Sequence, residues 1–140
     1  MRKEIYKEVN SDLTYGRGYV YSLQYHIVWC TKYRRKVLTG GAEDDCKALL
    51  RSLADEYHFQ IPAMEVMPDH VHLLIDCNPR YGIMQCVKDL KRESASQIKK
   101  DFPHLTSRLP NIWTRSTFIA TVGSVSLDVV KRYIENQKGV

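Results

Sequence analysis

Two histidines separated by a single residue are the side chains in this sequence best suited to bind a metal ion together. His70 and His72 lie in the segment Met67–Asp76, whose pattern predicts a β-strand beginning at His70. Side chains alternate between the two faces of a strand, so both imidazoles share one face, with Cα atoms roughly 6.5–7 Å apart. They can reach one divalent cation, because metal–nitrogen bonds are about 2.0–2.1 Å long. An H-x-H pair is more often structural, so other evidence must decide.

A tyrosine and a glutamine near the C-terminus form a second pair. Tyr133 and Gln137 are four residues apart in a segment with helical periodicity, so they are expected on one face of a helix. A tyrosine on an amphipathic helix usually packs in a core or an interface. In combination with His70 and His72, the pair suggests a tyrosine nucleophile assisted by a metal ion.

The composition is typical of a globular protein with one domain. The chain has 140 residues, and 21 Lys and Arg against 16 Asp and Glu give a net charge of +5. That charge is compatible with a polyanionic partner but does not establish one. We divide the chain into an N-terminal lead-in, residues 1–18, and a single domain, residues 19–140. Neither a signal peptide nor an apolar run of membrane-spanning length is recognisable, so we expect a cytoplasmic protein without a membrane partner.

Hydrophobic periodicity predicts an α+β fold. Strands are expected over residues 19–30, 59–67, 70–76 and 116–122, and helices over 42–57, 83–100 and a last segment that carries Tyr133 and Gln137. Pro62 predicts that the second strand is an edge strand or contains a bulge. Ser124 or Ser126 could cap the last helix. The order is the split βαβ pattern, which indicates a ferredoxin-like βαββαβ sandwich with an additional C-terminal helix carrying the tyrosine.

Basic side chains are concentrated after the first strand and on the second helix. A charged helix face is usually just solvated, so a nucleic-acid contact is one of two interpretations. The candidates for phosphate contacts are Lys32, Arg34, Arg35, Lys36, Lys88, Lys91, Arg92 and Arg115. Trp113 and Tyr33 could stack on unpaired bases, although packing is the more common role of such residues.

The remaining polar residues of interest have ordinary expected roles. His26, His58 and His104 are scattered, which favours structural or surface positions. Asp69 and Asp76 flank the histidine pair and are expected to form turns or face solvent. The four cysteines, Cys30, Cys46, Cys77 and Cys86, have neither zinc-site nor disulfide spacing, so we expect small buried apolar side chains.

With these residues identified, the sequence closely resembles the single-tyrosine HUH transposases (TnpA-like) of minimal bacterial insertion sequences. The resemblance runs from about Tyr21 to Gln137. It rests on four segments in the right order: YHIVWCTKYRRK at 25–36, MPDHVHLLI at 67–75, FIATVG at 118–123 and YIENQ at 133–137. One departure is Thr117, where the resemblance would place an aromatic residue.

The resemblance implies a homodimeric enzyme that cuts and rejoins single-stranded DNA at the ends of a mobile element. It implies that Tyr133 is the nucleophile, that His70 and His72 bind the metal, and that Gln137 is the third ligand. The ion would be Mg²⁺ or Mn²⁺, with no organic cofactor, and the intermediate a 5′-phosphotyrosine. Relatives recognise imperfect hairpins and often combine the histidines of one subunit with the tyrosine helix of the other.

Three other interpretations remain open at this stage. A non-catalytic or domesticated relative would bind hairpins without cutting them, and it would need neither Tyr133 nor the histidines. A related HUH nuclease would act on repeated chromosomal hairpins instead of its own element. A small structural protein could bind metal through His70 and His72, but this leaves the pairing of Tyr133 with Gln137 unexplained.

Overall fold

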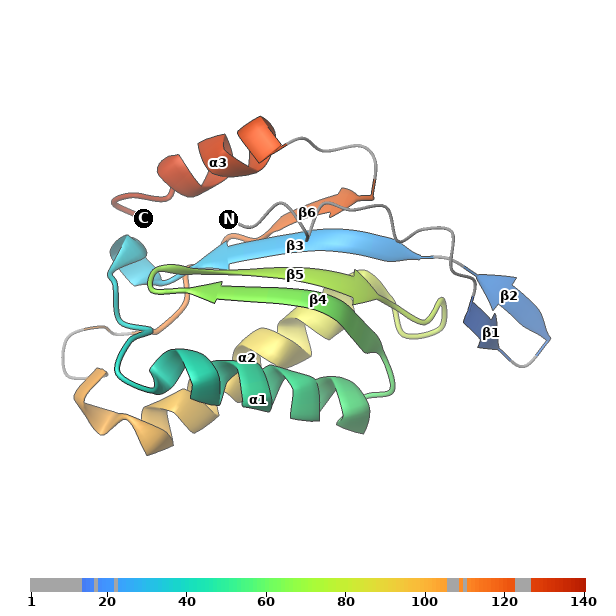
Figure 1. The fold of residues 1–140 in the computed structure, drawn as a ribbon, viewed down its shortest axis with the longest axis horizontal. Coiled ribbons are helices and arrows are strands. Elements are labelled where there is room, and N and C mark those ends of the chain that lie inside the picture. The colour runs from blue at the N-terminus through green and yellow to red at the C-terminus, as the bar shows by residue number, and fades with distance from the viewer. Residues whose placement is uncertain (1–13, 17, 22, 106–108, 110, 123–126) are drawn as a thin grey trace.

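A four-stranded antiparallel sheet holds the candidate residues in place. Across the sheet the strands are β4 (Gln60–Met67), β5 (His70–Asp76), β3 (Gln24–Cys30) and β6 (Phe118–Thr121). The helices are α1 (Ala42–Glu56), α2 (Ile83–Asp101) and α3 (Leu127–Glu135). This computed structural model describes residues 14–16, 18–21, 23–105, 109, 111–122 and 127–140 (Figure 1).

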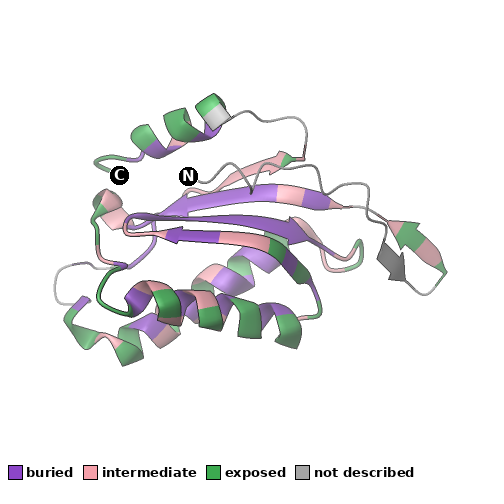
Figure 2. Ribbon diagram, viewed as in Figure 1, coloured by how far each residue is buried: buried purple, intermediate pink, exposed green. Residues whose placement is uncertain are grey.

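Helices cover both faces of this sheet. Helices α1 and α2 lie against one face and α3 lies on the other (Figure 1). On β3, Ile27 and Trp29 belong to the large core under α1 and α2, whereas Val28 and Cys30 pack with α3. The central strands β3 and β5 are accordingly buried along almost their whole length (Figure 2).

The register of β5 is fixed by its apolar side chains. Val71, Leu73 and Ile75 lie in the large core, and each is fully buried. Full burial of such a side chain stabilises the fold by about 1.5–3 kcal/mol. A slip of one residue would turn these three side chains to the α3 face and place the histidines in the core. The apolar residues therefore keep His70 and His72 on the α3 face.

The element order confirms the predicted α+β class. Strands and helices follow as β3-α1-β4-β5-α2-β6, with α3 as the additional C-terminal helix. Both expectations for Pro62 are confirmed, because β4 is an edge strand and its pairing with β5 shifts register between Gln60 and Ala63. All four cysteines are buried and free, as predicted. No helix in the described part of the chain is long and apolar enough to cross a membrane.

Three predicted boundaries are wrong. The strand expected over residues 19–30 is divided: β2 (Tyr19–Tyr21) pairs with β1 (Thr14–Gly16) in a separate small sheet, so the predicted lead-in also contains a strand. Strand β6 is shorter than 116–122, because Lys91 binds the carbonyl oxygens that precede it. Helix α3 ends at Glu135, before Gln137. Residues 1–13 and the predicted caps Ser124 and Ser126 lie outside the described residues.

Candidate active site

The two histidines of β5 lie on the sheet face that α3 covers. Opposite them on β3, Val28 pairs with His72 and Cys30 pairs with His70. Val28 and Cys30 pack against Val130 and Ile134 of α3, so the histidines sit beside the tyrosine helix. Burial, followed by the neighbouring His26 and His70, lowers the pKa of His72 to about 3. His72 is therefore neutral at physiological pH, the form in which imidazole binds metals.

A buried carboxylate fixes the orientation of His70. Nδ1 of His70 lies 2.8 Å from Oδ1 of Asp69, so it is the nitrogen that donates the hydrogen bond. Its Nε2 is buried and has no hydrogen-bond partner in the described part of the chain. A histidine whose one nitrogen donates to a carboxylate while the other offers a lone pair is the usual form of a metal ligand. Asp69 lies in a turn, as one of its two expected roles required, but its side chain is buried and does not face solvent. For Asp76 both expected roles are wrong, because it is a buried residue at the end of β5.

Sequence analysis missed His26 as a component of this site. Its Nδ1 lies 3.1 Å from Nε2 of His72, and both side chains are buried. Burial lowers the pKa of His26, so this imidazole too is held neutral near pH 7. Alternation along β3 puts His26 on the sheet face opposite to that of Ile27 and Trp29. Its position next to His72 depends in addition on the register, which pairs His26 with Leu74 and so makes His72 a diagonal neighbour on β5. That register is not readable from one sequence.

Tyr133 lies on the other side of β3 from the histidines. Its hydroxyl is 2.8 Å from Oγ of Ser116, and its ring packs against Phe118 at 5.4 Å between centroids. Phe118 belongs to β6, and β3 separates β6 from β5. Burial raises the pKa of Tyr133 above its ordinary value, although the Ser116 hydrogen bond opposes this shift. The phenol is therefore protonated at neutral pH and needs assistance to act as a nucleophile.

Gln137 is buried and lies in the turn that follows α3, not in the helix itself. Its N–H donates to the carbonyl oxygen of Ile134, three residues back, because α3 ends at Glu135. The prediction that Tyr133 and Gln137 share one face of a continuous helix is therefore wrong. Oε1 of Gln137 is buried and has no hydrogen-bond partner among the described residues. It resembles Nε2 of His70 in this respect.

The donor atoms fit a divalent cation. Nε2 of His70 and Oε1 of Gln137 are buried acceptors whose desolvation a bound cation would offset. Among the described residues no three His, Cys, Asp or Glu side chains gather with metal-binding geometry. The role of Gln137 as the third ligand, which the resemblance implies, stays a prediction. Burial raises the pKa of the Cys30 thiol to about 12, so this neighbouring sulfur is not a competing nucleophile.

Comparison with known proteins identifies the family. The family model described as "Transposase IS200 like" matches residues 19–137. The chain belongs to the IS200-like transposases. The family carries out DNA transposition, so this chain is a TnpA-like tyrosine transposase, as the four sequence segments predicted.

Individual relatives agree with this assignment. The transposase is 44% identical over 124 residues to the ISDra2 transposase TnpA of Deinococcus radiodurans, covering 87% of this chain and 89% of that protein. It is 28% identical over 123 residues to the transposase for insertion sequence element IS200 of Salmonella typhimurium, covering 84% and 81%. A solved structure of a candidate transposase from Deinococcus radiodurans superposes with a TM-score of 0.84 at 41% identity, covering 91% of this chain and 99% of that one.

A more distant structure shares the fold. It is a REP-associated tyrosine transposase bound to a REP hairpin, with a TM-score of 0.54 and 15% identity, covering 87% of this chain and 68% of that one. At this level of identity, the likeness shows a common architecture for the transposase and that protein.

Some of the predicted phosphate-binding side chains are exposed, and others already form ion pairs or hydrogen bonds within the protein. Arg35, Lys36, Lys88 and Arg115 are exposed, and Lys32 is half-buried with its ammonium over the Tyr33 ring. Arg34 is paired with Asp69, and Arg92 is paired with the buried carboxylate of Asp89. Lys91 is enclosed by backbone carbonyls. Trp113 is packed against Trp29 and donates to Ser94, which confirms the packing interpretation for this residue.

Lys91 is expected to be a structural residue of the transposase. Its Nζ donates to the carbonyl oxygens of Thr114 and Ser116 and to the hydroxyl of Thr117, while burial lowers its pKa to about 8. Lys91→Met removes the donor from three acceptors, so we expect a loss of about 1–3 kcal/mol in the free energy of unfolding. Urea denaturation measures it. The control Lys88→Met, at an exposed position of the same helix, should change stability by less than about 0.5 kcal/mol. Equal effects of the two substitutions would contradict the structural role.

Proposed function

We propose that this transposase cleaves and rejoins single-stranded DNA at insertion-sequence ends through a covalent tyrosine–phosphate ester. The observation that carries the proposal is the arrangement of His70, whose Nδ1 is held by Asp69 and whose buried Nε2 has no hydrogen-bond partner among the described residues. This histidine lies beside the helix that carries Tyr133. A buried nitrogen without a hydrogen-bond partner costs free energy in an ordinary core, whereas in a metal site the bound ion offsets that cost.

In this proposal His70, His72 and Gln137 hold Mg²⁺ or Mn²⁺, with no organic cofactor. The bound ion would neutralise charge on a non-bridging phosphate oxygen and on the leaving 3′-oxygen. Two neutral imidazoles and an amide leave the full charge of the cation available to the phosphate. These three side chains would hold the ion in place, and their burial keeps water away from the ligands.

Tyr133 would supply the reacting atom. Its Oη attacks the phosphorus, the bond to the 3′-oxygen breaks, and a 5′-phosphotyrosine and a free 3′-OH result. The phenol proton is lost and the leaving 3′-oxygen gains one, so the step is balanced without a co-reactant. In the reverse step, a 3′-OH from another strand attacks the ester and releases Tyr133. The ester retains the energy of the original bond, so joining requires no ATP.

The placement of Tyr133 favours an active site built from two chains. Its hydroxyl contacts Ser116 beside β6, whereas the histidines lie on β5 on the other side of β3. Neighbouring strands are about 4.8 Å apart, so roughly 10 Å separates β5 from β6. We propose that the transposase acts as a homodimer in which the tyrosine helix of one chain serves the histidines of the other.

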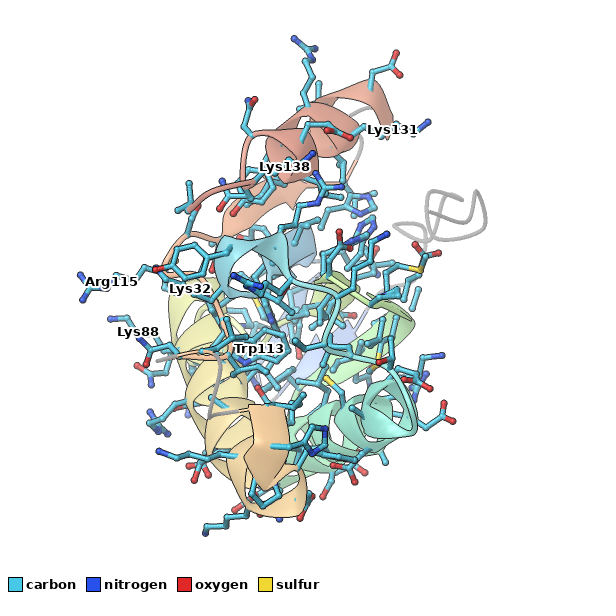
Figure 3. All side chains as sticks on the ribbon, turned by 90° about the vertical axis from the view of Figure 1, so that its left-hand side faces the viewer. Lys32, Lys88, Trp113, Arg115, Lys131 and Lys138 are labelled. Carbon is cyan, nitrogen blue, oxygen red and sulfur yellow. The ribbon has the colours of Figure 1, made fainter. Side chains whose placement is uncertain are left out.

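Exposed basic residues offer a surface for the DNA. Figure 3 shows Lys32, Lys88 and Arg115 towards the left-hand side of the molecule and Lys138 above them in the turn after α3, whereas Lys131 of α3 points to the right. Sequence analysis did not select Lys131 and Lys138. A relative of the same fold is bound to a REP hairpin. We therefore propose that the transposase recognises a hairpin near the element end through this basic surface.

The salt dependence of binding tests the basic surface. Replacing both Lys88 and Arg115 by alanine should weaken binding of hairpin DNA. It should also reduce the slope of log affinity against log salt by about 1 for each phosphate that is no longer neutralised. Fluorescence anisotropy over a series of salt concentrations measures both quantities. The control replaces Lys99 and Lys100, in the last turn of α2, by alanine and removes the same charge. Identical slopes for both double variants would assign the effect to net charge alone.

The proposed activity has a direct test. Labelled single-stranded DNA carrying the flanking element ends is incubated with the transposase and Mg²⁺ or Mn²⁺, and covalent protein–DNA adducts are resolved on a denaturing gel. We expect an adduct that requires the ion. Binding of hairpin DNA without any adduct, with either ion, would favour a hairpin-binding relative that has lost catalysis. Cleavage of chromosomal repeats but not of the element ends would favour a nuclease serving those repeats.

A further inference from the structure

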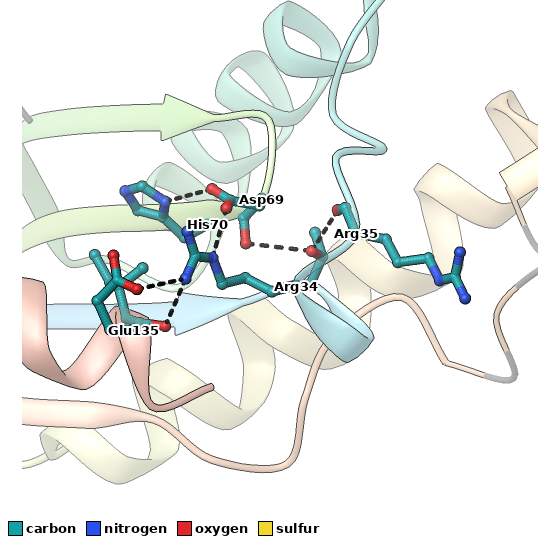
Figure 4. Close-up of polar contacts among 7 residues, drawn as sticks. Arg34, Arg35, Asp69, His70 and Glu135 are labelled. Atoms are coloured by element: carbon teal, nitrogen blue, oxygen red, sulfur yellow. Dashed lines mark hydrogen bonds and ion pairs between the residues drawn. The ribbon is translucent and has the colours of Figure 1, made fainter. Parts of the chain in front are cut away.

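The loop after β3 directs one arginine inward and leaves its neighbour in solvent. Tyr33 and Arg34 have backbone φ angles of 57° and 53°, in the left-handed region that side chains rarely adopt. The fully buried Thr31 holds this turn, since its hydroxyl donates to the carbonyl oxygens of Arg35 and Asp69. Two successive unfavourable residues persist only where the surroundings enforce them. The result is that Arg34 lies between two elements of the site, whereas Arg35 points away (Figure 4).

Towards β5, Arg34 completes the network that orients His70. Its Nε donates to Oδ2 of Asp69 at 2.8 Å, and Oδ1 of the same carboxylate accepts from Nδ1 of His70 at 2.8 Å. The hydrogen bond that Arg34 donates to Asp69 is the main cause of the raised pKa of Arg34. The side chains of Arg34 and Asp69 are only 21% and 11% exposed, so this is not a solvated surface ion pair. Both oxygens of Asp69 are thereby fixed in space.

Towards α3, the same guanidinium contacts the end of the tyrosine helix. Its Nη1 lies 3.5 Å from the carbonyl oxygen of Ile134 and 3.4 Å from a carboxylate oxygen of Glu135. These are the last two residues of α3, and Ile134 directly follows Tyr133. The last carbonyls of a helix lack partners within the helix and carry partial negative charge, so a cation stabilises them. Figure 4 shows the network from His70 to Glu135.

We propose that Arg34 is a positioning residue that couples metal binding at His70 to the docking of the tyrosine helix. The inference rests on the proposed function, because it takes His70 as a metal ligand and Tyr133 as the nucleophile. One side chain binds both the carboxylate that orients the ligand and the end of the helix that carries the nucleophile. Occupation of the metal site therefore stabilises the docked helix, and a docked helix strengthens metal binding by the same factor.

The coupling is measurable without DNA or catalysis. Mn²⁺ binding is followed by electron paramagnetic resonance, and the docking of α3 by hydrogen exchange of its amides with and without Mn²⁺. Arg34→Met keeps an aliphatic side chain without a branch at Cβ, which suits the left-handed backbone of this residue. It removes the positive charge and every hydrogen-bond donor of the guanidinium. We expect Mn²⁺ to bind about 10-fold more weakly, the lower end of the effect of losing a partner of a metal ligand, because Arg34 acts on His70 through Asp69. Mn²⁺ should slow exchange in α3 of the wild type and not of this variant.

Controls separate this role from simpler ones. Arg35→Met removes the same charge from the exposed neighbouring residue and should leave Mn²⁺ affinity within about twofold. If Arg34→Met fails to fold, Arg34→Lys keeps a cation but replaces the planar guanidinium, in which Nε contacts Asp69 and Nη1 contacts Ile134, by a single ammonium nitrogen. It should retain part of the Mn²⁺ affinity and lose the protection of α3.

The outcomes distinguish this inference from the proposed function. Wild-type protein that binds no Mn²⁺ would overturn the metal site and the coupling with it. Wild-type binding together with unchanged affinity and unchanged α3 protection in Arg34→Met would overturn the coupling alone. Weaker hairpin binding by Arg34→Met at unchanged Mn²⁺ affinity would instead establish Arg34 as a phosphate contact, as its position in the basic loop first suggested.

Discussion

Tyr133→Phe is expected to eliminate the covalent protein–DNA adduct while leaving hairpin binding intact. The substitution removes the one oxygen that would bond to phosphorus and keeps the ring that packs against Phe118. Without its nucleophile, the transposase should form adduct at least about 10³-fold more slowly. Denaturing gels of labelled DNA measure the adduct, and anisotropy measures binding in the same samples.

Ser116→Ala is the matched control for this substitution. The phenol of Tyr133 stays, but its hydroxyl loses the partner at 2.8 Å. A neutral hydrogen bond contributes about 0.5–1.5 kcal/mol, so adduct formation should remain within about tenfold of the wild type. An adduct that persists in Tyr133→Phe would contradict the assigned nucleophile. Tyr33, which is 45% exposed, is the tyrosine to substitute next in that case.

The fold was predictable because local patterns agree with the tertiary arrangement. Strand β5 begins and ends where its alternation predicts, since Val71, Leu73 and Ile75 all enter one core. Pro62 identified the edge strand because it cannot donate to a neighbouring strand. The boundary of β6 failed where a distant side chain competes for the backbone. Lys91 binds the carbonyls before β6, and no pattern within residues 116–122 reveals this.

The candidate site was predictable only in its most local parts. The shared face of His70 and His72 follows from strand geometry, which needs no partner strand. The neighbourhood of His26 depends on the register of β3 against β5. The inward position of Arg34 depends on a left-handed backbone at a residue that is not glycine, so sequence analysis grouped it with the exposed Arg35. Such contacts arise from tertiary packing that propensities do not encode.

His72→Ala is expected to abolish ion-dependent cleavage and to weaken Mn²⁺ binding strongly. His72 is fully buried and neutral, so its loss removes one of the nitrogen donors proposed for the ion. Loss of one of three proposed ligands should weaken binding at least about 100-fold, more than loss of a supporting residue. Electron paramagnetic resonance of Mn²⁺ measures the affinity, and thermal unfolding checks that the variant folds. The control His58→Asn changes an exposed histidine at φ 62°, a conformation that asparagine tolerates.

Mixing the two inactive variants decides where the tyrosine acts. In a homodimer with shared sites, a mixed dimer of Tyr133→Phe and His72→Ala has one site with both residues intact and one with neither. Random exchange of subunits makes half of the dimers mixed, so activity should return to about a quarter of the wild-type level. A site built within one chain gives no recovery, because every chain lacks one of the two residues. That result would require α3 to move the Tyr133 hydroxyl from Ser116 across β3 to the histidines of its own chain.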